Sequence, residues 1–163
     1  MNNTVHIQNM LDAAQSYADA HSTCVKVKVG SVIEISTISR THCMPLIYGC
    51  NHGLHNCKDT GCRRIELYGE NSKGHRLPSD CDAIHSEIDA ICNCSRSEFD
   101  TNNAIIYVTR YPCEACARAI VAAGINKVIY GRKESISDYT EQILKAGHVK
   151  IEHADWNAED NNA

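Results

Sequence analysis

The sequence predicts a single α/β domain in which helices cover both faces of a sheet. Segments with strand-like alternation and segments with helical spacing follow one another along the chain. The 163 residues are enough for one hydrophobic core without disulfide bonds, and no repeat or linker marks a second domain. We therefore expect one domain over residues 1–153 and a frayed polar tail, rich in Asp and Asn, over residues 154–163.

The first elements are a helix and a hairpin. Apolar residues recur at helical spacing from about Val5 to His21, which predicts an amphipathic helix. Residues Lys26–Ser36 alternate and contain several β-branched side chains, which predicts a strand. A polar turn at Ser39–His42 leads to the expected hairpin partner, Pro45–Gly49.

A cysteine-bearing insert over residues 51–82 breaks this pattern. The segment contains several glycines and three cysteines, Cys57, Cys62 and Cys81, and it has little apolar periodicity. A segment of this length in a compact domain is usually functional, disordered, or organised by something other than a core. The three cysteines favour a metal ion as the organiser.

The rest of the chain alternates helices with strands. We expect a helix at Ala83–Cys94, an apolar strand at Ala104–Thr109, a helix at Pro112–Ala123, a strand at Lys127–Gly131, a helix at Ser137–Ala146 and a final strand at Val149–His153. The helix at Pro112 has proline in its predicted first turn and Gly124 just after its end, where both residues are favoured.

Composition narrows the class of protein. The 16 basic and 20 acidic residues give a formal net charge of −4, which argues against a broad basic surface for nucleic acid. No apolar run approaches the ~20 residues of a membrane helix, and the first residues lack a secretory signal pattern. We therefore expect a cytoplasmic protein that binds neither membrane nor nucleic acid. In such a reducing compartment, its ten cysteines indicate metal ligands or reactive thiols.

Two short stretches carry the predicted chemistry, His85-Ser86-Glu87 and Pro112-Cys113-Glu114-Ala115-Cys116. His85, Cys113 and Cys116 would give Zn²⁺ three protein ligands and leave a fourth position for water, as in catalytic zinc sites. The start of the second helix favours thiolates at Cys113 and Cys116. Glu87 follows His85 by two residues and points elsewhere on a helix, so we expect it to act as a general acid/base.

Each stretch alone has ordinary interpretations. A lone C-x-x-C also occurs in redox pairs and zinc ribbons, and a lone H-x-E is usually a surface pair. Their conjunction, on a helix and on a later proline-started helix with an apolar strand between them, is much more specific. It matches the H-x-E…P-C-x-x-C signature of zinc-dependent nucleobase deaminases.

On these motifs the chain resembles the cytidine and deoxycytidylate (dCMP) deaminase superfamily from about Ser22 to Gly131, and within it the dCMP deaminase branch. Further segments that carry the resemblance are Ser22-Thr-Cys24, Lys28–Ile33, Gly49-Cys-Asn51 and Tyr107-Val-Thr109. The resemblance implies a three-layer α/β/α fold with a central mixed sheet of about five strands. It also implies zinc-dependent conversion of dCMP to dUMP with release of ammonia, zinc hydroxide attacking C4 and Glu87 shuttling the proton.

The resemblance extends to substrate and partners. It implies a homo-oligomer, often a hexamer, with dCTP and dTTP as effectors. For substrate binding we expect Asn51 to hold a sugar hydroxyl, with the plain Asx turn as its alternative. Ser86, Thr109 and Tyr111 complete the expected contacts, and Tyr107 is an alternative to Tyr111 at the base. Candidates for the phosphate are Lys28, Arg63, Arg64, Arg76 and Arg110, among which no spacing selects.

The chain departs from the family pattern around the expected nucleotide site. Cys50 replaces an aromatic residue, His52-Gly53-Leu54 replaces a Gly-x-Pro loop, Ser86 replaces the usual alanine, and Asp89 replaces an asparagine. These changes leave the zinc motifs intact. They bear on nucleotide selectivity and effector control, and Cys50 is the cysteine outside the two predicted metal sites that we expect to affect specificity.

Four further cysteines suggest a second metal ion. Cys24, Cys57, Cys62 and Cys81 resemble in position the cysteines of family members that carry a structural zinc. His55 and His75 are rival ligands, and the alternative is a set of ordinary buried thiols. We expect the remaining cysteines, Cys43, Cys92 and Cys94, to be plain thiols.

Three other functions share these motifs. A tRNA or nucleic-acid base deaminase uses the same zinc machinery, although it normally carries a basic flank. A deaminase of free cytidine or cytosine would differ in not requiring a phosphate. A non-catalytic binding module stabilised by zinc would have no use for Glu87.

Overall fold

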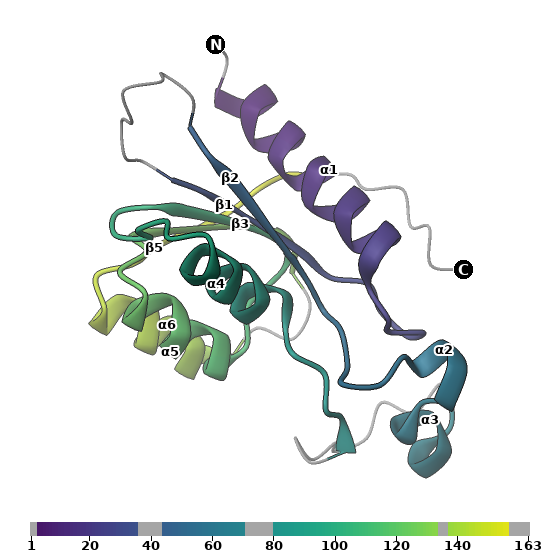
Figure 1. The fold of residues 1–163 in the computed structure, drawn as a ribbon. Coiled ribbons are helices and arrows are strands. Elements are labelled where there is room, and N and C mark those ends of the chain that lie inside the picture. The colour runs from purple at the N-terminus through teal and green to yellow at the C-terminus, as the bar shows by residue number, and fades with distance from the viewer. Residues whose placement is uncertain (1–2, 36–43, 71–79, 134–136, 157–163) are drawn as a thin grey trace.

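The structure, a computed structural model, describes residues 3–35, 44–70, 80–133 and 137–156. A sheet lies between helix α1 (Asn3–His21) on one face and three helices on the other (Figure 1). The three helices are α4 (Ser86–Arg96), α5 (Glu114–Ala122) and α6 (Asp138–Ala146). The strands are β1 (Gly30–Glu34), β2 (Leu46–Cys50), β3 (Ile105–Arg110), β4 (Lys127–Arg132) and β5 (Lys150–His153). The predicted three-layer α/β/α fold is confirmed.

The sheet is mixed, as predicted. Its strand order is β2-β1-β3-β4-β5, with β1 antiparallel to both of its neighbours and β3, β4 and β5 parallel to one another. The predicted hairpin is therefore confirmed, with Gly30 opposite Cys50 and Glu34 opposite Leu46. Its turn at Ser39–His42, and Cys43, lie outside the described residues.

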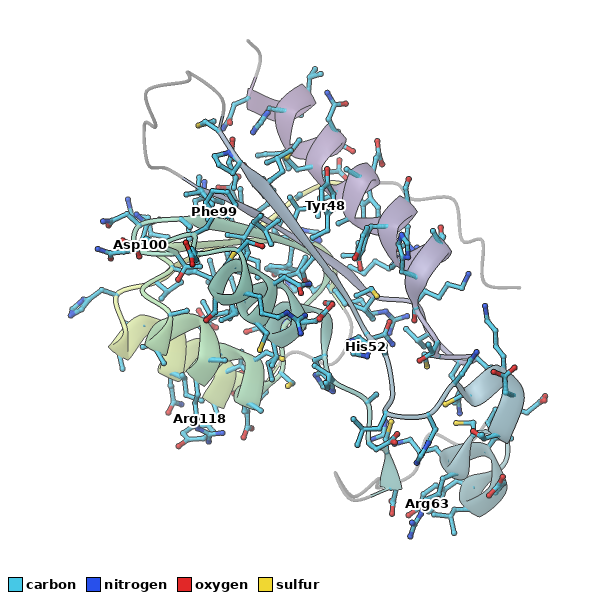
Figure 2. The ribbon with its side chains drawn as sticks, viewed as in Figure 1. Tyr48, His52, Arg63, Phe99, Asp100 and Arg118 are labelled. Atoms are coloured by element: carbon cyan, nitrogen blue, oxygen red, sulfur yellow. The ribbon has the colours of Figure 1, made fainter. Side chains whose placement is uncertain are left out.

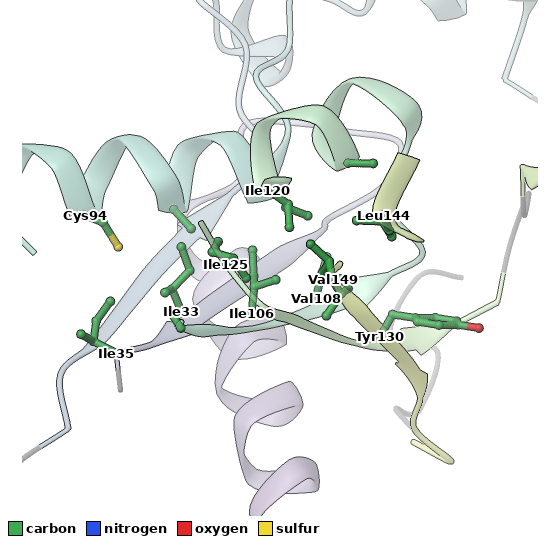
Figure 3. Close-up of a cluster of buried hydrophobic side chains, with 14 residues drawn as sticks. Ile33, Ile35, Cys94, Ile106, Val108, Ile120, Ile125, Tyr130, Leu144 and Val149 are labelled. Atoms are coloured by element: carbon green, nitrogen blue, oxygen red, sulfur yellow. The ribbon is translucent and has the colours of Figure 1, made fainter. Parts of the chain in front are cut away.

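The larger core lies between the sheet and the helices α4, α5 and α6. Alternate residues along the central strands point into it, among them Ile33 of β1, Ile35 just after β1, and Ile106 of β3 (Figure 3). Ile120 of α5 and Leu144 of α6 close it from the helical side, and all of these side chains are buried. This packing explains the apolar spacing that the sequence shows in these elements.

A smaller core on the opposite face packs α1 against the sheet. Ile7 and Leu11 of α1 meet Tyr107 of β3 and also meet Trp156, which is 7% exposed. The indole Nε1 of Trp156 donates a hydrogen bond to Asp12 at 2.8 Å. The packed part of the chain thus continues to Trp156, three residues beyond the predicted boundary at His153, because the indole covers the α1 face of the sheet. Residues 157–163 lie outside the described residues.

Three predicted element boundaries are wrong for local reasons. The helix predicted from Ala83 starts at Ser86, because Ile84 pairs with His52 in an isolated bridge and His85 is the N-cap. The strand predicted from Lys26 starts only at Gly30, because the carbonyl of Val27 and the N–H of Val29 bond to the side chain of Asn51 instead of a neighbouring strand. The helix predicted from Pro112 starts at Glu114, with Cys113 as its N-cap. The insert, predicted as irregular, contains two short helices, α2 (Cys57–Thr60) and α3 (Arg63–Tyr68).

Among the described helices, none is long and apolar enough to cross a membrane.

Candidate metal centre and active site

The N-terminal ends of two helices bring the predicted motifs together. His85 is the N-cap of α4 and Cys113 is the N-cap of α5. The segment before α4 is anchored by Ile84, which exchanges two backbone hydrogen bonds with His52 at 2.8 and 3.2 Å. The N–H of Tyr111, just before α5, donates to the carbonyl of Arg132 at 3.0 Å. Both motifs are therefore fixed by the ends of sheet strands.

The three predicted zinc ligands converge. His85 Nδ1 lies 3.4 Å from Cys113 Sγ and 3.4 Å from Cys116 Sγ, and the two sulfurs are 3.5 Å apart. Tetrahedral zinc with ordinary bond lengths holds sulfur and nitrogen about 3.6 Å apart and two sulfurs about 3.8 Å apart. His85, Cys113 and Cys116 form a cluster that could hold a metal ion. The donor set and its spacing fit zinc.

Interactions within the cluster favour the thiolate form of Cys113. The hydrogen bond with Cys116 lowers the pKa of Cys113 to about 3, and the bond with His85 adds to the effect. The same sulfur–sulfur hydrogen bond, together with burial, raises the pKa of Cys116. The pair therefore keeps one proton when no metal is bound. Zinc binding would displace that proton, since thiol ligands bind as thiolates.

Glu87 lies beside this cluster and is almost completely enclosed, with 4% of its surface exposed. Burial raises the pKa of its carboxyl group, and the positive charge of His85 opposes this effect. His85 and Cys113 are exposed at the surface of the pocket, whereas Cys116 is buried with Glu87. The site thus has an open side for substrate and a buried acid/base group behind it.

Helix α4 approaches the sheet very closely at Gly49 of β2. A Cβ atom at Gly49 would meet the carbonyl oxygen of Ser86 and the backbone nitrogen of Ala90, each at 2.4 Å. Only glycine permits this contact. The absence of a side chain at Gly49 therefore sets how deep the first turn of α4, which carries Glu87, lies on the sheet.

The site opens into a pocket of about 310 Å³, near the lower end of the range for small-molecule sites. Asn51, Ser86 and Tyr111, all predicted to bind substrate, are among its lining residues, together with the catalytic motifs. The Oδ1 atom of Asn51 accepts bonds from Ser22 and from the N–H of Val29, and its Nδ2 donates to Val27. Asn51 thus builds the turn and keeps one amide N–H for a ligand.

Two predicted substrate contacts are not brought to the pocket. Thr109 is completely buried, and its hydroxyl accepts a hydrogen bond from the N–H of Gly30 at 3.1 Å. Tyr107 donates its phenolic hydrogen to Glu34 at 2.7 Å and packs against α1. Both side chains project from β3 toward the α1 face because strand residues alternate. The sequence motif Tyr107-Val-Thr109 is therefore structural on its two outer positions.

The predicted phosphate ligands differ in whether they line the pocket. Arg64 and Arg110 line it, whereas Lys28 bonds to the carbonyl of Asp19 at 3.0 Å and does not. Arg63, on the same short helix as Arg64, is exposed at the outer end of the molecule (Figure 2). The Nε of Arg64 is buried and has no hydrogen-bond partner among the described residues. Arg76 lies outside the described residues.

The four other predicted metal ligands surround the same pocket. Cys24, Cys57, Cys62 and Cys81 are free, half-buried thiols that all line it. Burial raises the pKa of Cys57, and the nearby Cys62, Cys24 and Cys81 raise it further. These sulfurs are neighbours, but they are not gathered within the 4.8 Å that joins His85, Cys113 and Cys116.

The rival ligands and the remaining thiols take different places. His55 is exposed and lines a second pocket with Cys57, Cys62 and Cys81. His75 lies outside the described residues. Cys92 is exposed, and Cys94 is buried in the core.

Cys50 and Asp89, two of the positions at which the chain departs from the family pattern, are joined by a hydrogen bond. Asp89 accepts a hydrogen bond from the N–H of Cys50 at 3.0 Å and lies 3.3 Å from the imidazole Nε2 of His52. Burial, followed by the charge of Asp89, raises the pKa of Cys50 to about 11. Cys50 is not among the residues that line the pocket. It would therefore influence specificity only through the turn at Asn51.

Sequence reasoning missed two residues of the site. Lys26 lines the pocket, and its Nζ donates to the carbonyl of Glu70 at 3.0 Å. No spacing in the sequence indicates this position. Ser31 lies under the first turn of α4, where its hydroxyl group contacts that of Ser86. The sequence does mark this position, because Ser31 is the one polar residue in the alternating series Ser31, Ile33 and Ile35.

Comparison with known proteins agrees with this geometry. The sequence model for the cytidine and deoxycytidylate deaminase zinc-binding region matches residues 4–132, which include the whole site. The chain belongs to this family. As a member of the zinc-binding deaminases, it is an enzyme whose His85, Cys113 and Cys116 match the family's metal chemistry.

Two relatives show how much of the chain is similar in sequence to known proteins. The chain is 32% identical over 152 residues to the ComE operon protein 2 of Bacillus subtilis, covering 90% of this chain and 71% of that protein. It is 30% identical over 137 residues to the deoxycytidylate deaminase of Schizosaccharomyces pombe, covering 83% of this chain but only 40% of that one.

A solved structure shares the fold. The dCMP deaminase of cyanophage S-TIM5, crystallised in complex with dCMP and dUMP, superposes with a TM-score of 0.64 at 20% identity. The superposition covers 94% of this chain and 98% of the phage chain. At this identity the likeness establishes the three-layer deaminase fold.

Proposed function

We propose that this protein deaminates dCMP to dUMP, consuming one water molecule and releasing ammonia. The observation that carries the proposal is the buried carboxyl group of Glu87 beside the converging donors of His85, Cys113 and Cys116. A purely structural zinc site needs no acid/base group at this position. Family membership and the deoxycytidylate deaminases among the relatives support the same reaction.

Each residue of the site has a defined role in this reaction. His85, Cys113 and Cys116 would hold the zinc ion, which when bound supplies a Lewis acid that brings the pKa of a water molecule to about 7. Glu87 takes a proton from the attacking water and transfers it to ring nitrogen N3. Glu87 then takes the second proton of that water from the hydroxyl group now on C4 and delivers it to the amino group, which leaves as ammonia while the C4 oxygen becomes a carbonyl. Its burial suits this task because it raises the pKa of the carboxyl group and so favours the protonated form that Glu87 adopts during the transfer.

The decisive experiment replaces Glu87 by glutamine, which keeps the shape and removes the transferable proton. We expect Glu87→Gln to retain its zinc, measured by atomic absorption, and to lose about 10²–10⁴-fold in ammonia release from dCMP. Glu114→Gln is the matched control, because Glu114 lies in the first turn of α5 and its carboxylate bonds to Ser137 outside the pocket. Unimpaired turnover in a zinc-loaded Glu87→Gln protein would refute the mechanism.

The substrate assay should compare dCMP with CMP, dCTP, deoxycytidine and a tRNA stem-loop. Turnover of dCMP that exceeds that of deoxycytidine supports a nucleotide enzyme. Preferential turnover of the stem-loop, with a steep salt dependence, would instead indicate a nucleic-acid deaminase. Absence of turnover on every compound would leave only a zinc-stabilised binding module.

Arg64 is the residue that we assign to the substrate phosphate. Its guanidinium lines the pocket, its Nε has no partner among the described residues, and its positive charge reaches His85, where it lowers the imidazole pKa against a larger opposing effect of Cys113. Arginine recognises phosphate through charge-assisted, bidentate hydrogen bonds. We expect Arg64→Gln to raise KM for dCMP about tenfold or more and to leave deoxycytidine turnover unchanged. Arg63→Gln, on the exposed side of the same helix, is the control.

The remaining substrate contacts follow from the pocket lining. Asn51 offers its one remaining amide N–H to a sugar hydroxyl, and Tyr111 offers its ring to the base. The ring of Tyr111 is held edge-on by Tyr130, with ring centroids 5.0 Å apart. A KM increase for dCMP in Tyr111→Leu, with kcat retained, is the expected result.

We also assign Cys24, Cys57, Cys62 and Cys81 to a second, structural zinc ion. They tie the end of α1 to the insert and surround the same pocket, so a metal there would stabilise the wall that carries Arg64. Two zinc ions per chain are the expected stoichiometry. One zinc per chain, with these four thiols open to alkylation, would remove the second site.

Assembly, regulation and location complete the proposal. By the family resemblance, we expect a cytoplasmic homo-oligomer, a hexamer by light scattering, that dCTP activates and dTTP inhibits. A monomeric enzyme that is insensitive to both nucleotides would contradict this expectation.

A further inference from the structure

Two hydroxyl groups lie behind the catalytic carboxylate, one on the sheet and one at the start of α4, where its residue also lines the pocket. Ser31 is on the face of β1 that also carries Ile33, and Ile35 continues this alternation just after the strand; both isoleucines are part of the large apolar core. Ser86 is the first residue of α4. Both serines are 0% exposed. Burying a hydroxyl group costs free energy unless it is hydrogen-bonded, so a serine in this series of isoleucines calls for a partner.

The two serines are partners of each other and of Glu87. Ser31 Oγ and Ser86 Oγ are 2.7 Å apart, an ordinary distance for an O–H···O bond. Ser86 Oγ is also 3.2 Å from Oε2 of Glu87. An ionised carboxylate only accepts hydrogen bonds, so Ser86 donates to it and must then accept from Ser31. While Glu87 is ionised, the order of donation is therefore Ser31 to Ser86 to Glu87.

The backbone around this chain of bonds leaves little freedom. In the hairpin register Ser31 lies opposite Gly49, the glycine on which α4 closes. The close approach at Gly49 brings Ser86 onto the sheet directly beside Ser31. A distance of 3.2 Å to the carboxylate is long for a charge-assisted bond, as is common before substrate binds, and it is expected to shorten in the catalytic complex.

We propose that Ser31 and Ser86 are positioning residues that hold the Glu87 carboxylate in the orientation for proton transfer. The inference rests on the deamination proposed above, in which Glu87 carries the proton. A hydroxyl group can both donate and accept, so the same chain of bonds serves Glu87 when it is ionised and, with the donors reversed, when it is protonated. Ser86 stands where the resembled family usually has alanine, so this arrangement is a property of this chain.

The experiment is a double-mutant cycle on the zinc-loaded protein with dCMP as substrate. We expect Ser86→Ala to lower kcat about tenfold, a loss typical of a hydrogen bond to a charged group, with KM and zinc content nearly unchanged. Ser31→Ala should lower kcat by a smaller factor. The double variant Ser31→Ala/Ser86→Ala should be no slower than Ser86→Ala, because Ser31 acts only through Ser86.

A matched pair separates the hydroxyl group from its packing. Thr and Val have the same shape, so Ser31→Thr and Ser31→Val introduce the same methyl group, and only the first retains a donor. We expect kcat to be several-fold higher in Ser31→Thr than in Ser31→Val. Thr140→Val is the control for losing a buried hydroxyl elsewhere, because Thr140 in α6 is fully buried and is not among the residues that line the pocket.

The outcomes are distinct. Unchanged kcat in Ser86→Ala, additive effects in the double variant, or equal rates for Ser31→Thr and Ser31→Val would each overturn the positioning role. A loss of kcat that is proportional to the loss of bound zinc in the same variant would overturn it as well. Failure of the wild-type protein to deaminate dCMP or any other cytosine compound would instead overturn the proposed function, and the positioning role with it.

Discussion

Replacing Gly49 by alanine tests whether the close approach of α4 to the sheet sets the geometry of the active site. The added Cβ atom would lie 2.4 Å from the carbonyl oxygen of Ser86 and from the nitrogen of Ala90, whereas ordinary contact begins at 3.4 Å. Both neighbours are backbone atoms that cannot rotate away. The first turn of α4 must therefore move by about 1 Å relative to β2, and Glu87 moves with it.

The expected effects follow from this displacement. Overpacking of this kind lowers the free energy of unfolding by about 1–3 kcal/mol. A misplacement of about 1 Å at catalytic groups can lower kcat about 100-fold. Urea denaturation followed by circular dichroism gives the first quantity, and ammonia release from dCMP by zinc-loaded protein gives the second.

Gly69→Ala is the matched control. Gly69 follows α3, has a φ of +75°, and an added Cβ atom would meet nothing within 4 Å. The substitution imposes backbone strain of about 1–2 kcal/mol without touching the site. We expect Gly69→Ala to lose stability and to keep its kcat. If Gly49→Ala also kept its kcat within twofold, the close approach would not control the geometry of Glu87 and our reasoning would be refuted.

Two further predictions concern the two cores. Trp156→Ala should lower the free energy of unfolding by about 3–5 kcal/mol, because the indole is buried against α1 and bonds to Asp12; a loss below about 1 kcal/mol in urea denaturation would contradict its packing. Burial raises the pKa of Cys94 to about 11, so folding favours its neutral thiol. The stability that this thiol contributes is present below the unfolded-state pKa and is lost as the pH rises from about 9 to 11, by on the order of 2 kcal/mol. Cys94→Ala should flatten this alkaline decline in unfolding free energy, and an unchanged slope would argue against the cause.

The sequence predicts the zinc site well because its signal is local. His85, Cys113 and Cys116 lie at helix starts, and the two motifs identify all three donors, although His85 and Cys113 are 28 residues apart and meet only in the fold. The α/β alternation is similarly local, since each of the strands β1 to β4 coincides with an apolar segment. Short-range patterns of this kind predict helices and strands well, because each element forms from residues that are close in the sequence.

The remaining details depend on contacts between distant residues. Nothing near Val27 or Val29 shows that their backbone groups bond to Asn51 instead of a strand. The face of the sheet on which Tyr107 and Thr109 lie depends on how side chains alternate along β3, and a shift of one residue would move both to the other face. Arg63 and Arg64 are adjacent in the sequence, and only the fold of the insert shows which one faces the pocket.

The packing of Trp156 against α1 also has a consequence for the order in which the chain folds. Asp12 and Trp156 are 144 residues apart, and Gln8 reaches the carbonyl of Asp155 across 147 residues. During synthesis, α1 leaves the ribosome well before Asp155 and Trp156, so part of its apolar side lacks its partners until these residues emerge. Contacts of such long sequence separation form slowly. Until they form, Ile7 and Leu11 are exposed, and we expect this face to be where the nascent protein needs a chaperone.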